Sequence, residues 1–416
     1  MAKSDRKLRF GVVFAAWFLY TLSICLKMVY SSSMAAVKVE YEASNLITSL
    51  PITIHYVLYA GIQFALAYFV TKINIKRYMA INFVVAGVSF ISVFFYSPVW
   101  YIGFVLALNG ITLGPVWCGS ILIMTKFFSK SAMKKALLFV TSGFSIGSAM
   151  SFGISSLAIS LGNWRISFLI VGLAFLVATV YYLYIVTAAE KAGVKPEEES
   201  PAVQKETYKP SRVSAKNLLY MSIIATFFGS MLYYGFTHWL PTILLDNFDI
   251  STVKATLVST LFPTVVYIGP ILATLLVDKV KDDFKICVVS SIAISVFGLI
   301  LAFVFKLNIV LTVAVILVLG VLLRLINNLF ASLVPIHVKD YVNAGTTSAV
   351  LNASACLSAA LSPFLISLVL DASGNDWQVL FFVLFGVAIV LLLICGGFTA
   401  LDIVKRKKAQ NARNND

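Results

Sequence analysis

The stretch EKAGVKPEEESPAVQKETYKPSRVSAK, residues 190–216, is the longest polar segment in a chain otherwise dominated by apolar residues. It is rich in charged residues and contains prolines, a composition that is typical of a solvated segment without a core of its own. Long apolar segments lie on both sides of it. The stretch therefore predicts a linker that divides the chain into two halves.

The composition of the whole chain indicates a membrane protein, because 60% of residues are hydrophobic, 12% are charged and the mean hydropathy is +0.93. Apolar segments of about 18 residues or more can cross the hydrocarbon layer as helices. They are continuous and lack the alternation of barrel strands. We expect twelve spans, six on each side of the linker, at 10–37, 46–71, 77–97, 99–127, 135–161, 164–188, 216–245, 251–277, 284–305, 307–336, 343–370 and 377–401.

The predicted fold is thus an all-α membrane protein with two pseudo-symmetric six-helix bundles. We expect an N-terminal bundle at 1–188, a cytoplasmic linker at 189–215, a C-terminal bundle at 216–404 and a basic cytoplasmic tail at 405–416. A weak internal repeat supports this division. GNWRISFLIVG (162–172) and GNDWQVLFFVLFG (374–386) each begin the last span of their half, with Trp and Phe at equal spacing.

The basic residues predict the orientation, since short cytoplasmic loops retain Lys and Arg. With both termini inside, only Lys38, Arg165, Lys254 and Lys306 fall in outer loops. The formal charge of +14 is then a topology signal rather than a sign of nucleic-acid binding. We expect a multi-pass protein of a bacterial-type inner (plasma) membrane with both termini cytoplasmic. The first segment is too long for a cleaved signal peptide.

The sequence gives no indication of a metal, a cofactor or an enzymatic site. The five cysteines lie in apolar spans without paired or metal-ligand spacing, and only three histidines are present. A glycine-rich phosphate loop is missing, which argues against ATP-driven transport. Neither a nucleophile with a base nor a pair of catalytic carboxylates is apparent, so we expect no enzymatic activity.

Two basic residues, Lys27 and Arg324, are left within the predicted spans, and we place no carboxylate in the membrane interior to neutralise them. Such a cation costs roughly 3 kcal/mol on insertion scales and normally faces a cavity and a partner. Lys27 lies ten residues before Val37, about 15 Å from the span end. The alternatives are snorkelling for Lys27 and, for Arg324, capping the carbonyls of a broken helix.

Helical spacing brings further polar residues to the same faces. The candidate substrate-binding set is Lys27, Arg324, Tyr20, Tyr30, Tyr234, Asn109, Asn327 and Asn328. The tyrosines near span ends have interfacial anchoring as an alternative role. His55 and His238 are candidates for proton coupling, with a hydrogen-bonding or interfacial role as the alternative.

Taken together, the twelve spans, the six-plus-six division, the polar linker and NWRISF (163–168) resemble the major facilitator superfamily. NGITLGPVW (109–117), YGFTHWLPTIL (234–244) and LLVDKV (275–280) are similar to its organophosphate and organic-anion transporter branches. The resemblance implies alternating access around a central site lined by spans one, four, seven and ten. Lys27 and Arg324 would then face this site from opposite halves.

The resemblance also carries departures. Asp278 and Lys279 match the family's conformational loop in the second half, whereas Thr71 stands where the acid of the first-half loop belongs. Phosphate-ester exchangers of the family have one arginine in span one and another in span seven. Lys27 matches the first and Tyr233 occupies the second, so Arg324 could supply the missing charge from a different helix.

We therefore expect a secondary active or facilitative transporter of a small organic anion, a carboxylate, sulfonate or phosphate ester, with Lys27 and Arg324 as its ligands. It would be a monomer in the lipid bilayer without a cofactor. Two alternatives remain open: an exporter of neutral or anionic drugs or metabolites, and a membrane sensor that binds ligand without transporting it.

Overall fold

In the computed structural model, residues 3–69, 72–194, 196, 212–338, 340–342 and 344–414 are described, and every regular element among them is a helix. Twelve helices or helix runs in this part of the chain are long and apolar enough to cross a membrane. The predicted all-α fold with twelve spans is confirmed. Thr71 and most of the predicted linker lie outside the described residues.

The chain forms two compact units. Unit 1 comprises Met1–Val203, Leu240–Leu245 and Ile250–Thr264, and unit 2 comprises Gln204–Trp239, Asp246–Asp249 and Val265–Asp416. The division passes through two predicted spans of the second half, near Pro241 and Pro263. Two short segments of those spans therefore pack with the N-terminal helices.

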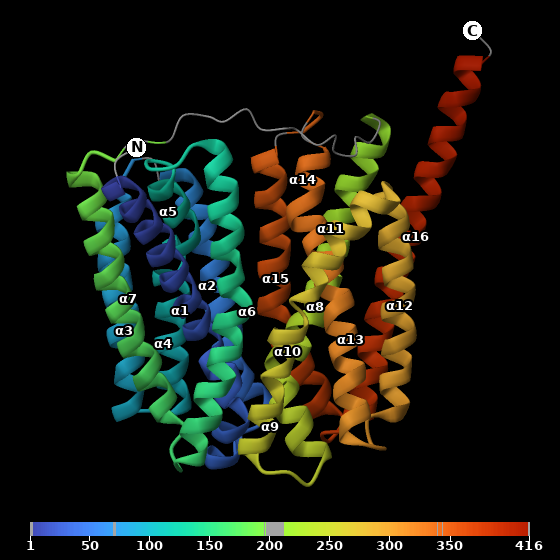
Figure 1. The fold of residues 1–416 in the computed structure, drawn as a ribbon. Coiled ribbons are helices and arrows are strands. Elements are labelled where there is room, and N and C mark those ends of the chain that lie inside the picture. Colours follow the sequence, from blue (N-terminus) through green and yellow to red (C-terminus); the bar gives the residue numbers. More distant parts are fainter. Residues whose placement is uncertain are drawn as a thin grey trace. The chain divides into compact units, whose positions relative to one another are not determined.

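Unit 1 is built from six membrane spans. Its helices, shown in blue to green in Figure 1, are α1 (Lys3–Tyr41), α2 (Asn45–Phe69), α3 (Ile75–Phe95), α4 (Val99–Thr112), α5 (Pro115–Met124), α6 (Lys130–Ser160) and α7 (Arg165–Lys191). The main packing partners are α1 with α6 and α7, α2 with α4, and α3 with α7. The short helix α9 (Thr252–Ser259) packs on α6 and α1 in the same unit.

Unit 2 contains the remaining spans. Its helices are α8 (Arg212–Asn247), α11 (Ile268–Val280), α12 (Asp283–Val304), α13 (Ile309–Asn328), the π-helix η1 (Leu329–Leu333), α14 (Val334–His337), α15 (Ala344–Ala372) and α16 (Trp377–Asn414), with α10 (Leu261–Val265) at the boundary. α12 packs on α16 and α13, and α11 packs on α13.

Three spans are interrupted where proline removes a backbone donor. Pro115 begins α5 after Gly114, Pro263 lies in the short α10, and Pro335 follows the π-helix of the tenth span. A proline inside a helix removes the bond to the carbonyl four residues earlier, and a local 3₁₀ or π turn accommodates the change. Several predicted spans are therefore runs of shorter helices.

Serine hydroxyls join the helices within each unit. Ser32 on α1 lies 3.0 Å from Ser151 Oγ and 2.7 Å from Ser155 Oγ of α6. In unit 2, three serines one turn apart on α15 donate to carbonyls one turn apart on α8, in the pairs Ser354–Ile223, Ser358–Phe227 and Ser362–Met231. Small hydroxyl residues let membrane helices approach closely and bond across the interface.

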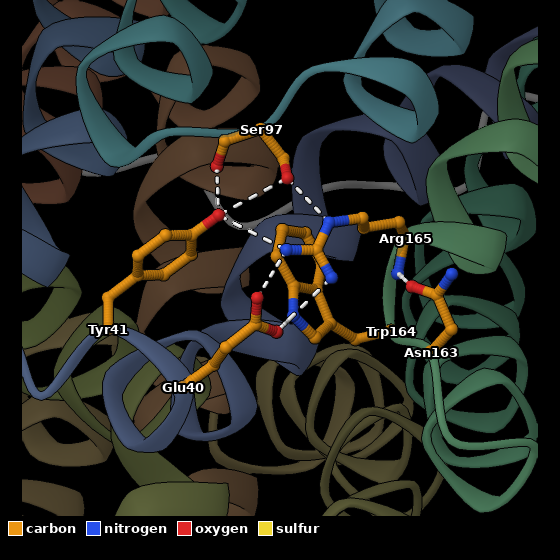
Figure 2. Close-up of polar contacts among 6 residues, drawn as sticks. All are labelled: Glu40, Tyr41, Ser97, Asn163, Trp164 and Arg165. Carbon is orange, nitrogen blue, oxygen red and sulfur yellow. Dashed lines mark hydrogen bonds and ion pairs between the residues drawn. The ribbon is translucent and has the colours of Figure 1, made fainter.

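The first and last spans of each unit are tied together by a tryptophan and a carboxylate. In unit 1, Trp164 Nε1 donates to Glu40 Oε2 at 2.6 Å, and Arg165 pairs with the same carboxylate and donates to Ser97 Oγ (Figure 2). In unit 2, Trp377 Nε1 donates to Asp246 Oδ2 at 3.3 Å. The repeat seen in the sequence thus corresponds to one structural contact that occurs in both units.

At the opposite end of α7, Glu190 pairs with Lys76 of α3 at 2.6 Å and with Lys126, which follows α5, at 3.2 Å. These ion pairs join three helices of unit 1 at the end where the predicted linker begins.

Candidate functional site

Lys27 lies on α1 with its Nζ 3.8 Å from the ring centroid of Tyr59 on α2. Both side chains are half-buried. α1 continues to Tyr41, so Lys27 is 14 residues from the helix end, about 21 Å along the axis. This distance is beyond the reach of a lysine side chain. A cation over an aromatic face gains about 0.5–2 kcal/mol, depending on how far it is desolvated. We call Lys27 and Tyr59 the unit 1 cation site.

His55 lies one turn before Tyr59 on α2, and the two rings are stacked with centroids 6.2 Å apart. Its Nδ1 lies 3.0 Å from the carbonyl oxygen of Leu106 on α4. The helices touch closely here, since a Cβ at Gly110 would lie 2.4 Å from the His55 carbonyl oxygen. His55 is buried, and its Nε2 has no hydrogen-bond partner among the described residues.

Three other predicted site residues of unit 1 are placed differently. Tyr20 packs against Trp117 of α5, with ring centroids 5.1 Å apart. Tyr30 is fully buried and donates to the carbonyl oxygen of Thr48 at 2.8 Å. Asn109 is also fully buried and donates to Ser89 Oγ at 3.0 Å and to its own helix. Tyr30 and Asn109 therefore join neighbouring helices, and they are not part of the proposed site.

Arg324 on α13 has its guanidinium carbon 5.2 Å from the ring centroid of Tyr233 on α8. Close packing of α11 on α13 fixes the backbone at this point. A Cβ at Gly269 would lie 2.5 Å from the Val321 carbonyl oxygen and 2.8 Å from Arg324 Cβ. We call Arg324 and Tyr233 the unit 2 cation site. Its arrangement parallels that of unit 1, with one cation over one tyrosine of a neighbouring helix.

The two asparagines that follow Arg324 bond to neighbouring helices. Asn327 Nδ2 donates to Ser230 Oγ of α8 at 2.7 Å, and Asn328 Nδ2 lies 3.5 Å from the Pro270 carbonyl oxygen of α11. Both asparagines are half-buried. They hold α13 against α8 and α11 around the unit 2 cation site.

Tyr234 and His238, one turn apart on α8, are stacked with centroids 5.8 Å apart and an interplanar angle of 14°. His238 is buried, whereas Tyr234 is half-buried. Asp278 and Lys279 are exposed on the last turn of α11. Arg324 and Asn327 therefore both contact α8, and the predicted conformational loop lies at the end of α11.

Two carboxylates that the sequence places in cytoplasmic segments are buried in the protein. Asp283 and Asp402 are buried in unit 2, at 0% and 2% exposed, and both lie in helices apolar enough to span a membrane. Asp283 pairs with His337, while Asp402 Oδ1 lies 3.4 Å from Asn217 Nδ2. Both acids lie near the ends of their spans, where sequence alone places them in loops.

Tyr59 was not predicted as the partner of Lys27. Periodicity relates residues of one helix and does not predict which residue of a neighbouring helix they meet. Tyr233 was noted only because of the missing span-seven arginine. Among the described residues, no group of three or more His, Cys, Asp or Glu side chains is placed to hold a metal ion.

The family model of the Major Facilitator Superfamily matches residues 16–363, most of the chain. The chain belongs to this superfamily. It is 22% identical over 406 residues to a glucose-6-phosphate exchanger of Xenopus tropicalis. The aligned region covers 85% of this chain and 80% of the relative. Members of the superfamily are transporters of small molecules rather than enzymes, and the chain is accordingly a multi-pass membrane transporter.

Solved structures show the same fold at low identity. A bacterial homologue of the human lysosomal transporter Spinster has a TM-score of 0.72 at 14% identity, with 97% of each chain covered. A D-xylose–proton symporter has a TM-score of 0.71 at 12% identity, covering 92% of this chain and 97% of its own. At these identities the likeness extends to the superfamily fold alone.

Proposed function

We propose that this transporter carries a small organic anion, a carboxylate, sulfonate or phosphate ester, with Lys27 and Arg324 as its ligands. The observation that carries the proposal is the position of Arg324 over the ring of Tyr233. Tyr233 occupies the place of the span-seven arginine in the phosphate-ester exchangers that the sequence resembles. Arg324 therefore supplies a positive charge beside the position where those relatives carry theirs.

The chemistry of the two cation sites supports anion binding. A tyrosine face is a weak partner for a cation, worth about 0.5–2 kcal/mol. Charge-assisted hydrogen bonds to an anion are roughly twice as strong as neutral ones, and guanidinium binds carboxylates and phosphates in bidentate fashion. An anionic substrate can thus add contacts stronger than those of the tyrosine rings.

The glucose-6-phosphate exchanger of Xenopus tropicalis supports the phosphate-ester class, coarsely, at 22% identity. Exchange of one anion for another needs no buried proton carrier, and it is the coupling that we favour. We further propose that the protein acts as a monomer in a bacterial-type inner membrane with both termini cytoplasmic, in agreement with the distribution of its basic residues.

Counterflow of radiolabelled anions in proteoliposomes tests this proposal. A panel of mono- and dicarboxylates, sulfonates and sugar phosphates identifies the class, and uptake against an unlabelled internal pool measures exchange. Absence of counterflow with every anion would refute anion transport. Substrate binding without counterflow would favour the sensor, and accumulation of neutral compounds would favour the exporter.

The residues are tested with K27Q and R324Q. We expect each to reduce counterflow by at least about tenfold, which corresponds to the loss of about 1.4 kcal/mol or more. The matched controls are K254Q and R77Q, because Lys254 and Arg77 are exposed. Controls that retain exchange exclude a general effect of charge removal. Near wild-type counterflow in both K27Q and R324Q would refute their role as ligands.

A further inference from the structure

A buried acid–base pair lies in unit 2 outside the cation sites. His337 Nδ1, at the end of α14, is 2.7 Å from Asp283 Oδ2, at the start of α12, and the two side chains are 1% and 0% exposed. Asp283 Oδ1 is buried and has no hydrogen-bond partner among the described residues. A carboxylate with one free buried oxygen is energetically costly unless a proton compensates for it.

The net charge of the pair depends on one proton. With neutral imidazole and ionised carboxylate the pair carries −1, and with one added proton its net charge is zero. Removing an uncompensated charge from water costs several kcal/mol, and attraction within an ion pair offsets much of that cost. A buried pair with zero net charge avoids the cost that a buried pair with a charge of −1 carries.

Other ionisable groups lie on the elements that adjoin α12 and α14. Asp282 is already committed to capping α12, because its Oδ1 accepts from the backbone of Phe284 and Lys285. The other charged or titratable groups on adjoining elements are Lys285 and Cys287 on α12, Asp278 and Lys279 on α11 with Lys281 after it, Arg324 on α13, Asp340 and Tyr341 after α14, Cys356 and Asp371 on α15, and Cys395, Asp402 and Lys405 on α16.

His337 is connected to the unit 2 cation site by an irregular segment. After Asn328 the helix continues as the π-helix η1 and then as α14, which contains Pro335. π-helical turns occur mostly as single interruptions and frequently at functional sites. The irregular turn gives α14 a point at which it can move while α13 keeps its packing on α11.

We propose that Asp283 and His337 form a proton-binding site that controls the contact between α14 and α12. The proton comes from water at this end of unit 2 and returns to it when the pair becomes hydrated. The protonated pair stays buried and holds α14 in place. Loss of the proton leaves a buried negative charge and favours opening of this end to water.

Cys287 provides a readout that needs no substrate. It lies one turn after Asp283 on α12, is fully buried and is close enough to interact electrostatically with Asp283. The test uses a variant that keeps only this cysteine, with Cys25, Cys118, Cys356 and Cys395 replaced by Ala. Labelling of Cys287 by a maleimide in this variant reports opening of this end of unit 2 to water. K285C, with Cys287 also replaced by Ala, provides an exposed reference on the same helix. The ratio of the two labelling rates removes the effect of pH on thiol reactivity.

We expect this ratio to rise about tenfold between about pH 5 and pH 8, the range in which histidine changes charge. D283N removes the negative charge, so its labelling at high pH should stay as low as that of the parent at low pH. H337Q leaves the carboxylate without imidazole and should label strongly at neutral pH. A ratio that does not change with pH, or stronger labelling of D283N at every pH, would show a purely structural pair.

The consequence for transport rests on the proposed function. Binding of a proton at the pair should slow anion counterflow. Counterflow should therefore fall as the pH is lowered on the side of the membrane to which this end of unit 2 opens. D283N should remove this pH dependence of counterflow. The two proposals fail separately. Cysteine labelling decides the proton site even if no anion is exchanged, and pH-independent labelling in a protein that exchanges anions refutes the proton site alone.

Discussion

Each of the two intramembrane cations lies over the ring of a tyrosine from a neighbouring helix. Lys27 Nζ is 3.8 Å from the Tyr59 ring centroid, and the Arg324 guanidinium carbon is 5.2 Å from that of Tyr233. A carboxylate in the same place would hold the cation firmly and repel an incoming anion. An aromatic face stabilises the cation without adding negative charge.

Replacing the ring of Tyr59 tests its role in positioning Lys27. Y59F keeps the aromatic face, and we expect anion counterflow within about threefold of wild type because the contact is retained. Y59L removes the face and should lower counterflow by about 5- to 30-fold, as expected for a loss of about 1–2 kcal/mol. Y184L is the matched control, because Tyr184 is 69% exposed. Equal counterflow in Y59F and Y59L would show that the ring has no such role.

The helices themselves were largely predictable, whereas the contacts between them were not. The spans follow from apolar length. The interruptions near Pro115, Pro263 and Pro335 were not predicted, and Pro51, Pro241 and Pro363 lie inside unbroken helices. Tyr30 was predicted to bind substrate, yet it donates to the Thr48 carbonyl oxygen of α2. A polar residue in a membrane helix meets either substrate or another helix, and only packing decides which.

α9 is the part of the eighth span that packs in unit 1. It bonds to that unit through Ser156 Oγ of α6, which donates to the Val253 carbonyl oxygen at 3.0 Å, and through Thr256, 3.5 Å from the Ser32 carbonyl oxygen. The chain that follows it, from Val265 onward, belongs to unit 2. If α9 separates from α6 during the transport cycle, a covalent link between them should stop it.

A disulfide between α6 and α9 tests this movement. In a background without native cysteines, oxidised S156C/V253C should reduce anion counterflow by at least about tenfold, with recovery after reduction. S32C/S151C is the control, because it joins α1 to α6 inside the N-terminal helices and should leave exchange unchanged. Full exchange with the α6–α9 disulfide formed would show that these helices stay together.

At the scale of the whole molecule, the two units share the contact between their first and last spans. Trp164 donates to Glu40 in unit 1, and Trp377 donates to Asp246 in unit 2. In each unit a phenylalanine four residues after the tryptophan packs on it, with ring centroids 5.7 Å apart for Phe168 and 6.3 Å apart for Phe381. The short sequence repeat is therefore a packing unit that each half retains.

The units differ in what surrounds this contact. Glu40 also pairs with Arg165, whereas Gln378 occupies the matching position in unit 2. W164F and W377F each remove a hydrogen bond to a charged acceptor, worth about 1.5–3 kcal/mol, and both should lower the thermal unfolding midpoint of purified protein. E40Q should lower the midpoint as well, because the neutral amide keeps an acceptor for the tryptophan but loses the attraction to Arg165. W100F is the control, because Trp100 is 67% exposed. If E40Q leaves the midpoint unchanged, the arginine of NWRISF adds nothing to unit 1 beyond the tryptophan bond.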